Sequence, residues 1–161
     1  MKNPERQEPN DEAIEAIGRL ADAVRALRAA RVIRSNRITG DLGEWYVEQL
    51  YCGTRTPSQT QKGFDVMLPD TNERLQVKAQ TFDPNNQWNY LDSDTALFDR
   101  IVIVILTPSF KLHHLYEMKV AELRGVVRIG KEHRPRYYWK DLVRIDPQTL
   151  PGFDKLLGLI E

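Results

Sequence analysis

The chain has 161 residues and a formal net charge of zero, with 23 Lys and Arg balanced by 23 Asp and Glu. Its 41% hydrophobic residues suffice for one globular domain with a helical extension. A single cysteine, Cys52, excludes an intrachain disulfide framework and a cysteine metal cluster. The polar N-terminus argues against a signal peptide, and no apolar run is long enough to cross a membrane. We therefore expect a soluble, cytoplasmic protein.

The N-terminal part of the sequence differs from the rest. Residues 1–10 combine two prolines with alternating charges, which is typical of a disordered tail. Residues 11–35 place apolar side chains at three- and four-residue steps and predict an amphipathic α-helix. This helix could pack on the domain's own core or join two copies of the chain. The pattern favours neither, and two heptads are too few to indicate a coiled coil.

Residues 36–161 have the pattern of one α/β domain with a mixed sheet of four to five strands. A helix is predicted from about Asp41 to Tyr51, and a last short helix over residues 150–160. The segment 82–95 is either an ordered loop over the site or a mobile lid. The remaining expected elements are strands at 64–68, 73–79, 99–107 and 111–118, with a hairpin turn at 69–72, a short helix at 119–124 and a basic, aromatic stretch within 126–145.

Three chemistry-bearing side chains lie on neighbouring elements of this domain. Glu44 follows the helix start Gly-Asp-Leu-Gly, Asp65 opens a strand in Gly-Phe-Asp-Val, and Lys78 follows Gln76 by two residues in the returning strand. An antiparallel hairpin brings Asp65 beside the Gln76–Lys78 end, and residues two apart leave the same face of a strand. Carboxylates that hold Mg²⁺ beside a lysine that orients or deprotonates a water are what metal-assisted phosphodiester hydrolysis requires.

This constellation resembles the PD-(D/E)XK nuclease superfamily over roughly residues 38–118. The resemblance implies an α/β, restriction-endonuclease-like mixed β-sheet flanked by helices, and a DNA endonuclease of restriction, defence or repair type that uses Mg²⁺ or Mn²⁺. It implies Asp65 as principal metal ligand, Glu44 as supporting ligand, Gln76 as ligand or water positioner, and Lys78 as catalytic lysine. The Val77 carbonyl, between the last two, is a candidate further ligand. Many members of the superfamily cut DNA as homodimers.

The sequence departs from the superfamily pattern in two places. Gln76 stands where Glu or Asp is usual, although Mrr-like restriction nucleases also carry Gln-x-Lys. A neutral amide lowers the charge of the site, which leaves open a catalytically inactive nuclease-fold protein that acts as a nucleic-acid-binding or defence-complex subunit. The common core also has a helix between its third and fourth strands, whereas about five residues separate Thr107 from Leu112. Either the end of the fold is rearranged, or the fourth strand lies around residues 137–145.

Simpler structural roles remain open for the same side chains. Glu44 could complete a capping box with Asp41, Asp65 could only end a strand, and Lys78 could be a solvent-facing lysine on an edge strand. His113 and His114 are neighbours in a strand, so we expect them to point to opposite faces and to make a poor metal pair.

Nucleic-acid contacts are expected after the catalytic strands. Residues 101–144 carry nine Lys and Arg against four acidic residues, as a phosphate-facing surface needs. Within them, the stretch 134–140 mixes cations with three aromatic residues, which suits backbone contact and base stacking. A partly buried strand has the same pattern. The candidate contacts are Gln80, Arg134, Arg136, Tyr138 and Lys140.

Overall fold

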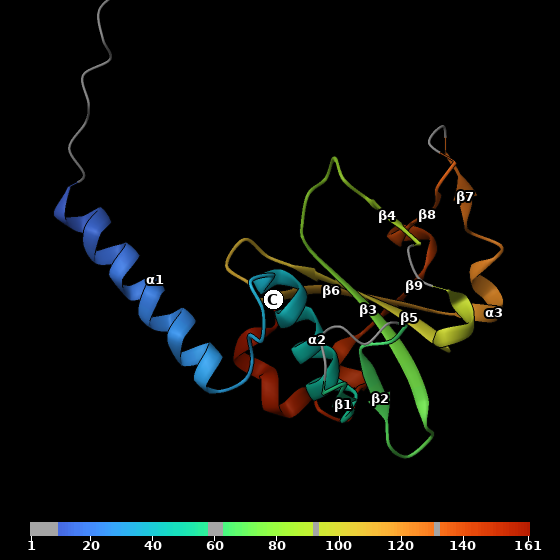
Figure 1. Cartoon of the computed structure of the whole chain (residues 1–161), viewed down its shortest axis with the longest axis horizontal. Helices are drawn as coiled ribbons and strands as arrows, with labels where there is room; N and C mark the ends of the chain where they lie inside the picture. Colours follow the sequence, from blue (N-terminus) through green and yellow to red (C-terminus); the bar gives the residue numbers. More distant parts are fainter. Residues whose placement is uncertain (1–9, 58–62, 92–93, 131–132) are drawn as a thin grey trace, which may run out of the picture. The chain divides into compact units, whose positions relative to one another are not determined.

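A computed structural model describes residues 10–57, 63–91, 94–130 and 133–161 of the chain (Figure 1). The predicted tail lies outside these residues except for Asn10. The chain divides into two compact units, residues 1–34 and 35–161. None of the described helices is long and apolar enough to span a membrane.

The first unit is built around helix α1 (Asp11–Ala29), which is the amphipathic helix expected from the sequence. Asn10 caps it, because its Oδ1 accepts a hydrogen bond from the Ala13 N–H at 2.8 Å. The helix ends before residue 35. Arg31 adopts a positive φ of 57°, and the Val32 N–H donates to the Leu27 carbonyl across the turn. This is a Schellman termination, which satisfies the last carbonyls of the helix.

The second unit contains a mixed sheet of six strands, where four to five were predicted. The order is β1-β2-β3-β5-β6-β9; β3 and β5 run parallel, and the other neighbouring strands pair antiparallel. The strands are β1 (Thr54–Arg55), β2 (Val66–Leu68), β3 (Glu73–Thr81), β5 (Arg100–Leu106), β6 (Leu112–Lys119) and β9 (Val143–Ile145). The two edge strands, β1 and β9, have only two and three residues. The predicted hairpins β2–β3 and β5–β6 are both present.

One face of this sheet is covered by α2 (Ile38–Leu50), which begins three residues earlier than predicted. Gly43 lets the helix backbone approach β3 closely, because a Cβ at this position would stand 2.3 Å from the Ala79 Cβ. The last segment, a 3₁₀ helix η4 (Phe153–Leu159), packs against α2. The Tyr46 hydroxyl can donate to the carbonyls of Phe110 and Leu159, at 3.0 and 3.3 Å. The short helix expected at residues 150–160 is therefore present in 3₁₀ form.

The opposite face carries a second sheet of three strands, ordered β4-β8-β7. These are β4 (Trp88–Tyr90), β8 (Pro135–Tyr138) and β7 (Arg128–Ile129), accompanied by the short helix α3 (Val120–Leu123) and the 3₁₀ turns η1 (Thr95–Leu97) and η2 (Trp139–Asp141). A further 3₁₀ turn, η3 (Pro147–Thr149), contacts η4. Residues of β5 at alternate positions point to this side. They share a core whose buried members are Phe98, Ile101, Ile103, Ile105, Tyr116, Met118, Leu123, Tyr137, Trp139 and Leu142.

Two sequence predictions need correction here. The segment 82–95 is not only a loop or lid, because it contains β4 and belongs to the crossover that joins β3 to the parallel strand β5. The described part of this crossover contains the short strand β4 and the 3₁₀ turn η1 (Thr95–Leu97). The strand parallel to β3 is thus β5, and residues 137–145 instead supply the end of β8 and the edge strand β9.

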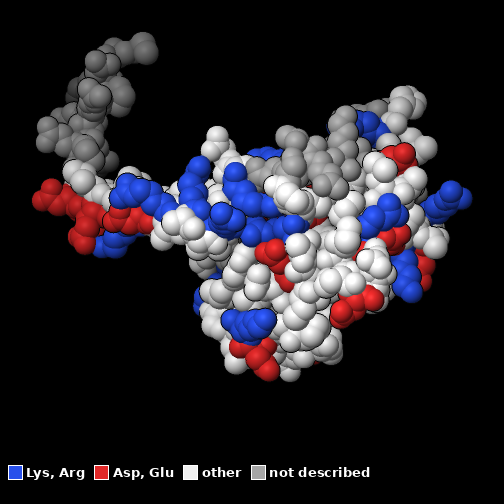
Figure 2. All heavy atoms as spheres, turned by 60° about the horizontal axis from the view of Figure 1, so that its bottom comes forward, with Lys and Arg blue, Asp and Glu red and all other residues white. Residues whose placement is uncertain are grey.

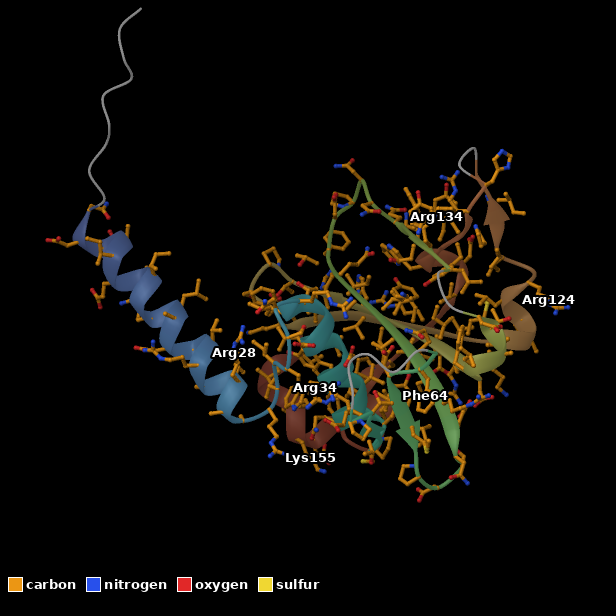
Figure 3. All side chains as sticks on the ribbon, viewed as in Figure 1. Arg28, Arg34, Phe64, Arg124, Arg134 and Lys155 are labelled. Atoms are coloured by element: carbon orange, nitrogen blue, oxygen red, sulfur yellow. The ribbon has the colours of Figure 1, made fainter. Side chains whose placement is uncertain are left out.

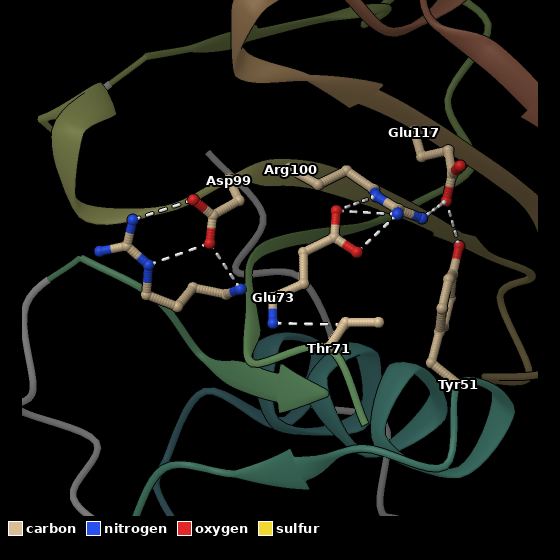
Figure 4. A network of polar contacts seen from close by, with 7 residues as sticks. Tyr51, Thr71, Glu73, Asp99, Arg100 and Glu117 are labelled. Carbon is tan, nitrogen blue, oxygen red and sulfur yellow. Dashed lines mark hydrogen bonds and ion pairs between the residues drawn. The ribbon is translucent and has the colours of Figure 1, made fainter. Parts of the chain in front are cut away.

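A polar network fixes the start of β3 against its neighbours (Figure 4). Arg100 on β5 bridges Glu73 on β3 at 2.7 Å and Glu117 on β6 at 3.0 Å. The Tyr51 hydroxyl, at the end of α2, donates to the same Glu117 carboxylate at 2.7 Å. Burial and the nearby Glu117 charge raise the pKa of Tyr51, so this hydroxyl stays protonated and remains a donor.

A second ion pair joins the same two strands. Arg74 pairs with Asp99 at 2.9 Å, and the Arg74 N–H also donates to the Asp99 carboxylate. The Arg74 hydrogen bonds hold the pKa of Asp99 below its usual range. Both pairs lie where β3 and β5 begin, and they fix the register that places Gln76 opposite Ile101 and Lys78 opposite Ile103.

We predict that Arg100→Met lowers the free energy of unfolding by about 3 kcal/mol, because two partly buried carboxylates lose their shared cation. Urea denaturation would measure the loss. The matched control is Arg124→Met at an exposed cation after α3, for which we expect a change within about 0.5 kcal/mol. A loss below about 1 kcal/mol for Arg100→Met would mean that the network contributes no more than exposed ion pairs do.

Candidate active site

Asp65 is held at the point where β2 and β3 separate. Its Oδ2 accepts hydrogen bonds from the Gln76 Nε2 at 2.6 Å and from the Val77 N–H at 2.7 Å. Its own N–H donates to the Leu75 carbonyl at 2.9 Å. The last β2–β3 pair is Val66 with Leu75. Beyond it, the Asp65 side chain supplies the hydrogen-bond acceptor for the Val77 N–H of β3. The predicted proximity of Asp65 and Gln76 is confirmed.

Gly63, two residues before Asp65, occupies a position that requires a glycine. It has a φ of +114°, which side chains rarely adopt, and a Cβ there would lie 2.5 Å from the Leu97 Cβ. The chain therefore passes η1 closely before it turns into β2. The Thr56 N–H donates to the Asp65 carbonyl at 2.9 Å and fixes the backbone on the other side. Asp65 is thus positioned by its surroundings as well as by its own side chain.

A pocket of about 270 Å³ opens beside Asp65. It brings together the predicted residues of α2, of the chain before β2, and of β3. Its lining residues are Arg37, Gly40, Asp41, Glu44, Asp65, Gln76, Val77, Lys78 and Ala79. The four residues predicted as catalytic and the predicted ligand Val77 are all among them.

Glu44 reaches this pocket from the second turn of α2. The helix begins at Ile38, and its N-cap is Arg37, which makes no side-chain capping bond. Asp41 instead lies inside the helix, where its Oδ2 accepts a hydrogen bond from the Ser35 N–H at 2.5 Å. The capping-box interpretation of Asp41 and Glu44 is therefore wrong. Arg37 and Asp41 also line the pocket and were not predicted from the sequence. A helix predicted to begin at residue 38 would have placed both of them near Glu44.

Lys78 lies beyond the end of the β2–β3 ladder, so at this position β3 pairs with β5 alone. The strand edge is open here, as the edge-strand interpretation of this lysine required. By strand alternation Gln76 and Lys78 share one face of β3, as predicted, whereas Val77 points to the other. The Lys78 side chain is half-buried in the pocket wall.

The Gln76 amide has a defined orientation because of its partner. An ionised carboxylate only accepts hydrogen bonds, so the amide NH₂ must face Asp65 and the carbonyl Oε1 must point elsewhere. Gln76 is 7% exposed, and this pairing compensates part of its burial. A glutamate here would place two carboxylates within hydrogen-bonding distance and would need a proton or a cation between them.

The donor set suits a hard cation. In the described residues no group of three or more His, Cys, Asp or Glu side chains gathers as a metal cluster. The pocket offers the Glu44 and Asp65 carboxylates together with the neutral oxygens of Gln76 and Val77. Mg²⁺ is commonly bound through one or two carboxylates and completes its shell with water and substrate phosphate, so this set fits it.

The residues predicted to contact nucleic acid lie outside the pocket. Gln80 connects β3 to the second sheet, because its Nε2 donates to the Asn86 carbonyl and its Oε1 accepts from the Asn89 amide. Arg134, Arg136 and Tyr138 belong to the second sheet or its approach, and Lys140 follows in η2 with its Nζ 6.0 Å from the Trp139 ring centroid.

The two histidines of β6 do not point apart as expected. Their rings stack, with centroids 3.9 Å apart, next to a register shift between Ile105 and Leu106 on the neighbouring strand. An irregular ladder breaks the strict alternation of side chains, which explains the difference. Burial lowers the pKa of His114, and the nearby His113 and Arg144 act in the same direction.

Comparison of the sequence with protein-family models and with curated proteins gives no match.

We predict that Gln76→Glu makes stability dependent on Mg²⁺. In EDTA the variant should lose about 1–3 kcal/mol of unfolding free energy, because a hydrogen bond becomes a carboxylate repulsion. Millimolar Mg²⁺ should restore part of this loss, since a ligand that binds only the folded state stabilises it. Chemical denaturation with and without Mg²⁺ measures both effects.

Gln80→Glu is the matched control, because it makes the same change four residues along the same face of β3 but outside the pocket lining. Its stability should not respond to Mg²⁺. Equal responses of the two variants would show that Asp65 and residue 76 do not form a cation site.

Proposed function

We propose that the chain is a Mg²⁺-dependent DNA endonuclease of the PD-(D/E)XK type, whose active site is the pocket lined by α2, the chain before β2, and β3. The observation that carries this proposal is the convergence in one pocket of Glu44, Asp65, Gln76 and Lys78, which come from three separate elements. Each residue alone has a simpler explanation. Their convergence is what phosphodiester hydrolysis needs and what a structural role leaves unexplained.

The order of elements supports the proposal. A helix with the supporting carboxylate comes first, then the β2–β3 hairpin with Asp65 and Gln-x-Lys, and then the parallel strand β5. This order agrees with the resemblance seen in the sequence. The described part of the crossover between β3 and β5 contains β4 and η1, and the residues of β3 that line the pocket precede this crossover.

The residues have distinct tasks in this proposal. Mg²⁺, when bound, acts as a Lewis acid on the phosphate and lowers the pKa of a bound water. Asp65 and Glu44 hold the cation, and the Val77 N–H bond fixes the direction in which the Asp65 carboxylate points. Lys78 places a positive charge on the face that it shares with Gln76, where it orients the attacking water and faces the phosphate.

A second candidate function follows from Gln76. Its amide satisfies Asp65 without a cation, and the three carboxylates that line the pocket, Asp41, Glu44 and Asp65, give a lower negative charge than a fourth at position 76 would. The same pocket could therefore belong to a catalytically inactive nucleic-acid-binding or defence-complex subunit. Such a protein would bind DNA but would not cut it at any Mg²⁺ or Mn²⁺ concentration.

We predict that the wild-type protein cuts at least one of supercoiled plasmid, single-stranded DNA and a four-way junction with Mg²⁺ or Mn²⁺. Lys78→Ala should lower the rate at least about 100-fold, which is the usual contribution of a positioned group that stabilises charge in the transition state. Lys155→Ala, at an exposed lysine of η4, is the control and should cut as the wild type does. Gel assays of nicked and linear product measure the rates.

The possible results separate the two functions. Cleavage that is unchanged in Lys78→Ala would place the active site elsewhere or indicate a contaminating nuclease. Binding of DNA by both proteins, with no cleavage of any substrate, would favour the inactive subunit.

We also propose that two copies pair through α1, as an enzyme that cuts both DNA strands would require. The helix carries Asp11 and Glu12 in its first turn and Arg28 in its last. In Figure 2 the red acidic side chains gather at the amino-terminal end of this helix. Two antiparallel copies would place the acidic end of one against the basic end of the other, with the apolar stripe that contains Ile14 and Ile17 between them.

We predict that Ile17→Asp converts such a dimer to a monomer, because it places a charge inside the apolar stripe. Sedimentation equilibrium over a range of protein concentrations measures the mass. Arg19→Ala changes the polar side of the same helix and should leave the dimer intact. A wild type that stays monomeric at every concentration would exclude pairing through α1.

A further inference from the structure

The second sheet presents two different faces. Asn89 on β4 bonds to Gln80 on the main sheet, and Tyr137 on β8 is fully buried, so these two side chains point inward. Since side chains alternate along a strand, Trp88 and Tyr90 point outward from β4, and Arg136 and Tyr138 point outward from β8. The register confirms this grouping, because Trp88 lies opposite Tyr138 and Tyr90 opposite Arg136.

Aromatic rings and guanidinium groups alternate on this outer face. The Arg134 Cζ lies 3.8 Å from the Tyr90 ring centroid, and the Arg136 Cζ lies 5.3 Å from that of Trp88. Arg128 on β7 approaches the Tyr138 ring at 5.4 Å. Figure 3 labels Arg134 beside the strands of the small sheet. We call the set Trp88, Tyr90, Arg128, Arg134, Arg136 and Tyr138 the stacking face.

We propose that the stacking face binds single-stranded nucleic acid. The inference rests on the proposed function for the identity of the polymer, and it names the form of DNA that the enzyme would hold. Rings of this kind stack on the faces of unpaired bases, and guanidinium groups bind phosphate and stack on bases as well. A duplex hides the faces of its bases, so a surface of rings discriminates in favour of unpaired strands.

The composition of the face favours this ligand over an apolar protein partner. Arg134 and Arg136 add positive charge among three rings, and Arg128 is paired with Asp141 at 3.5 Å, whereas a core-like interface is depleted of charge.

The stacking face is attached to the catalytic strand. Gln80 lies two residues beyond Lys78 on the same face of β3, and its side chain bonds Asn89, which stands between Trp88 and Tyr90. A polymer held on this face is therefore bound by elements anchored next to the active-site strand. We infer that the preferred substrate carries an unpaired segment, such as a flap, an overhang or an open junction.

The test measures binding without cleavage. Fluorescence anisotropy in EDTA would compare a labelled 12-nucleotide thymidine strand with a duplex of equal length, using the full chain. The wild type should bind the single strand more tightly than the duplex. Trp88→Ala and Tyr90→Ala should each weaken single-strand binding about tenfold, as loss of one stacked base does. Trp88→Phe should retain most of the affinity.

Arg134→Ala keeps the test valid if an aromatic variant fails to fold, because Arg134 is exposed. It should reduce the slope of log affinity against log salt by about 0.7, the value for one phosphate contact on a single strand. Lys155→Ala is the control, and we expect neither its affinity nor its salt slope to change. Circular dichroism would confirm that each variant is folded.

Each outcome is informative about one proposal. Equal or tighter binding of the duplex, or unchanged single-strand binding in folded variants of Trp88, Tyr90 and Arg134, would overturn the stacking face while leaving the nuclease proposal intact. Binding that behaves as expected in a protein that cuts no DNA would retain the stacking face and reject the nuclease.

Discussion

The site depends on one carboxylate that replaces a missing strand. Beyond Leu75 the β2–β3 ladder stops, and the Asp65 side chain accepts the Val77 N–H that a strand partner would otherwise bind. Hydrogen bonds of this type to a charged group contribute about 1.5–3 kcal/mol. They also allow β3 to continue toward Thr81 with its edge open beside α2. The pocket exists because the two strands separate there, and Asp65 makes that separation stable.

Gln76 affects both the stability of the folded pocket and its capacity to bind a cation beside Asp65. A glutamate in its place would add a ligand for a cation and would also add repulsion whenever the cation is absent. The amide removes the repulsion by donating to Asp65 at 2.6 Å. The folded site is thereby stable without metal, at the expense of one negative charge. Any metal affinity must then come from Asp65 and Glu44 together with neutral oxygens and the substrate, which would couple metal binding to DNA binding.

The sequence predicted the parts of the site that local rules determine. A tight turn between two apolar runs specifies a hairpin, and the hairpin places Asp65 opposite Gln76 without further information. The crossover was harder, because the three residues of β4 are stabilised by pairing with β8, which lies some fifty positions later. Stacked His113 and His114 depend on a register shift between strands, and the outward direction of Trp88 depends on Asn89 finding Gln80. Such long-range contacts leave no periodic signal in a single sequence.

Strand β3 is where these levels of organisation meet. Its first residues, Glu73 and Arg74, are fixed to β5 by ion pairs; its centre carries Gln76 and Lys78; and its last part holds the second sheet through Gln80. A shift of β3 by one residue would turn Gln76 and Lys78 to the α2 face and detach Asn89. The register of β3 therefore determines both the geometry of the candidate site and the position of the stacking face. The charged pairs at the start of the strand act on the candidate site through this register, although none of them lines the pocket.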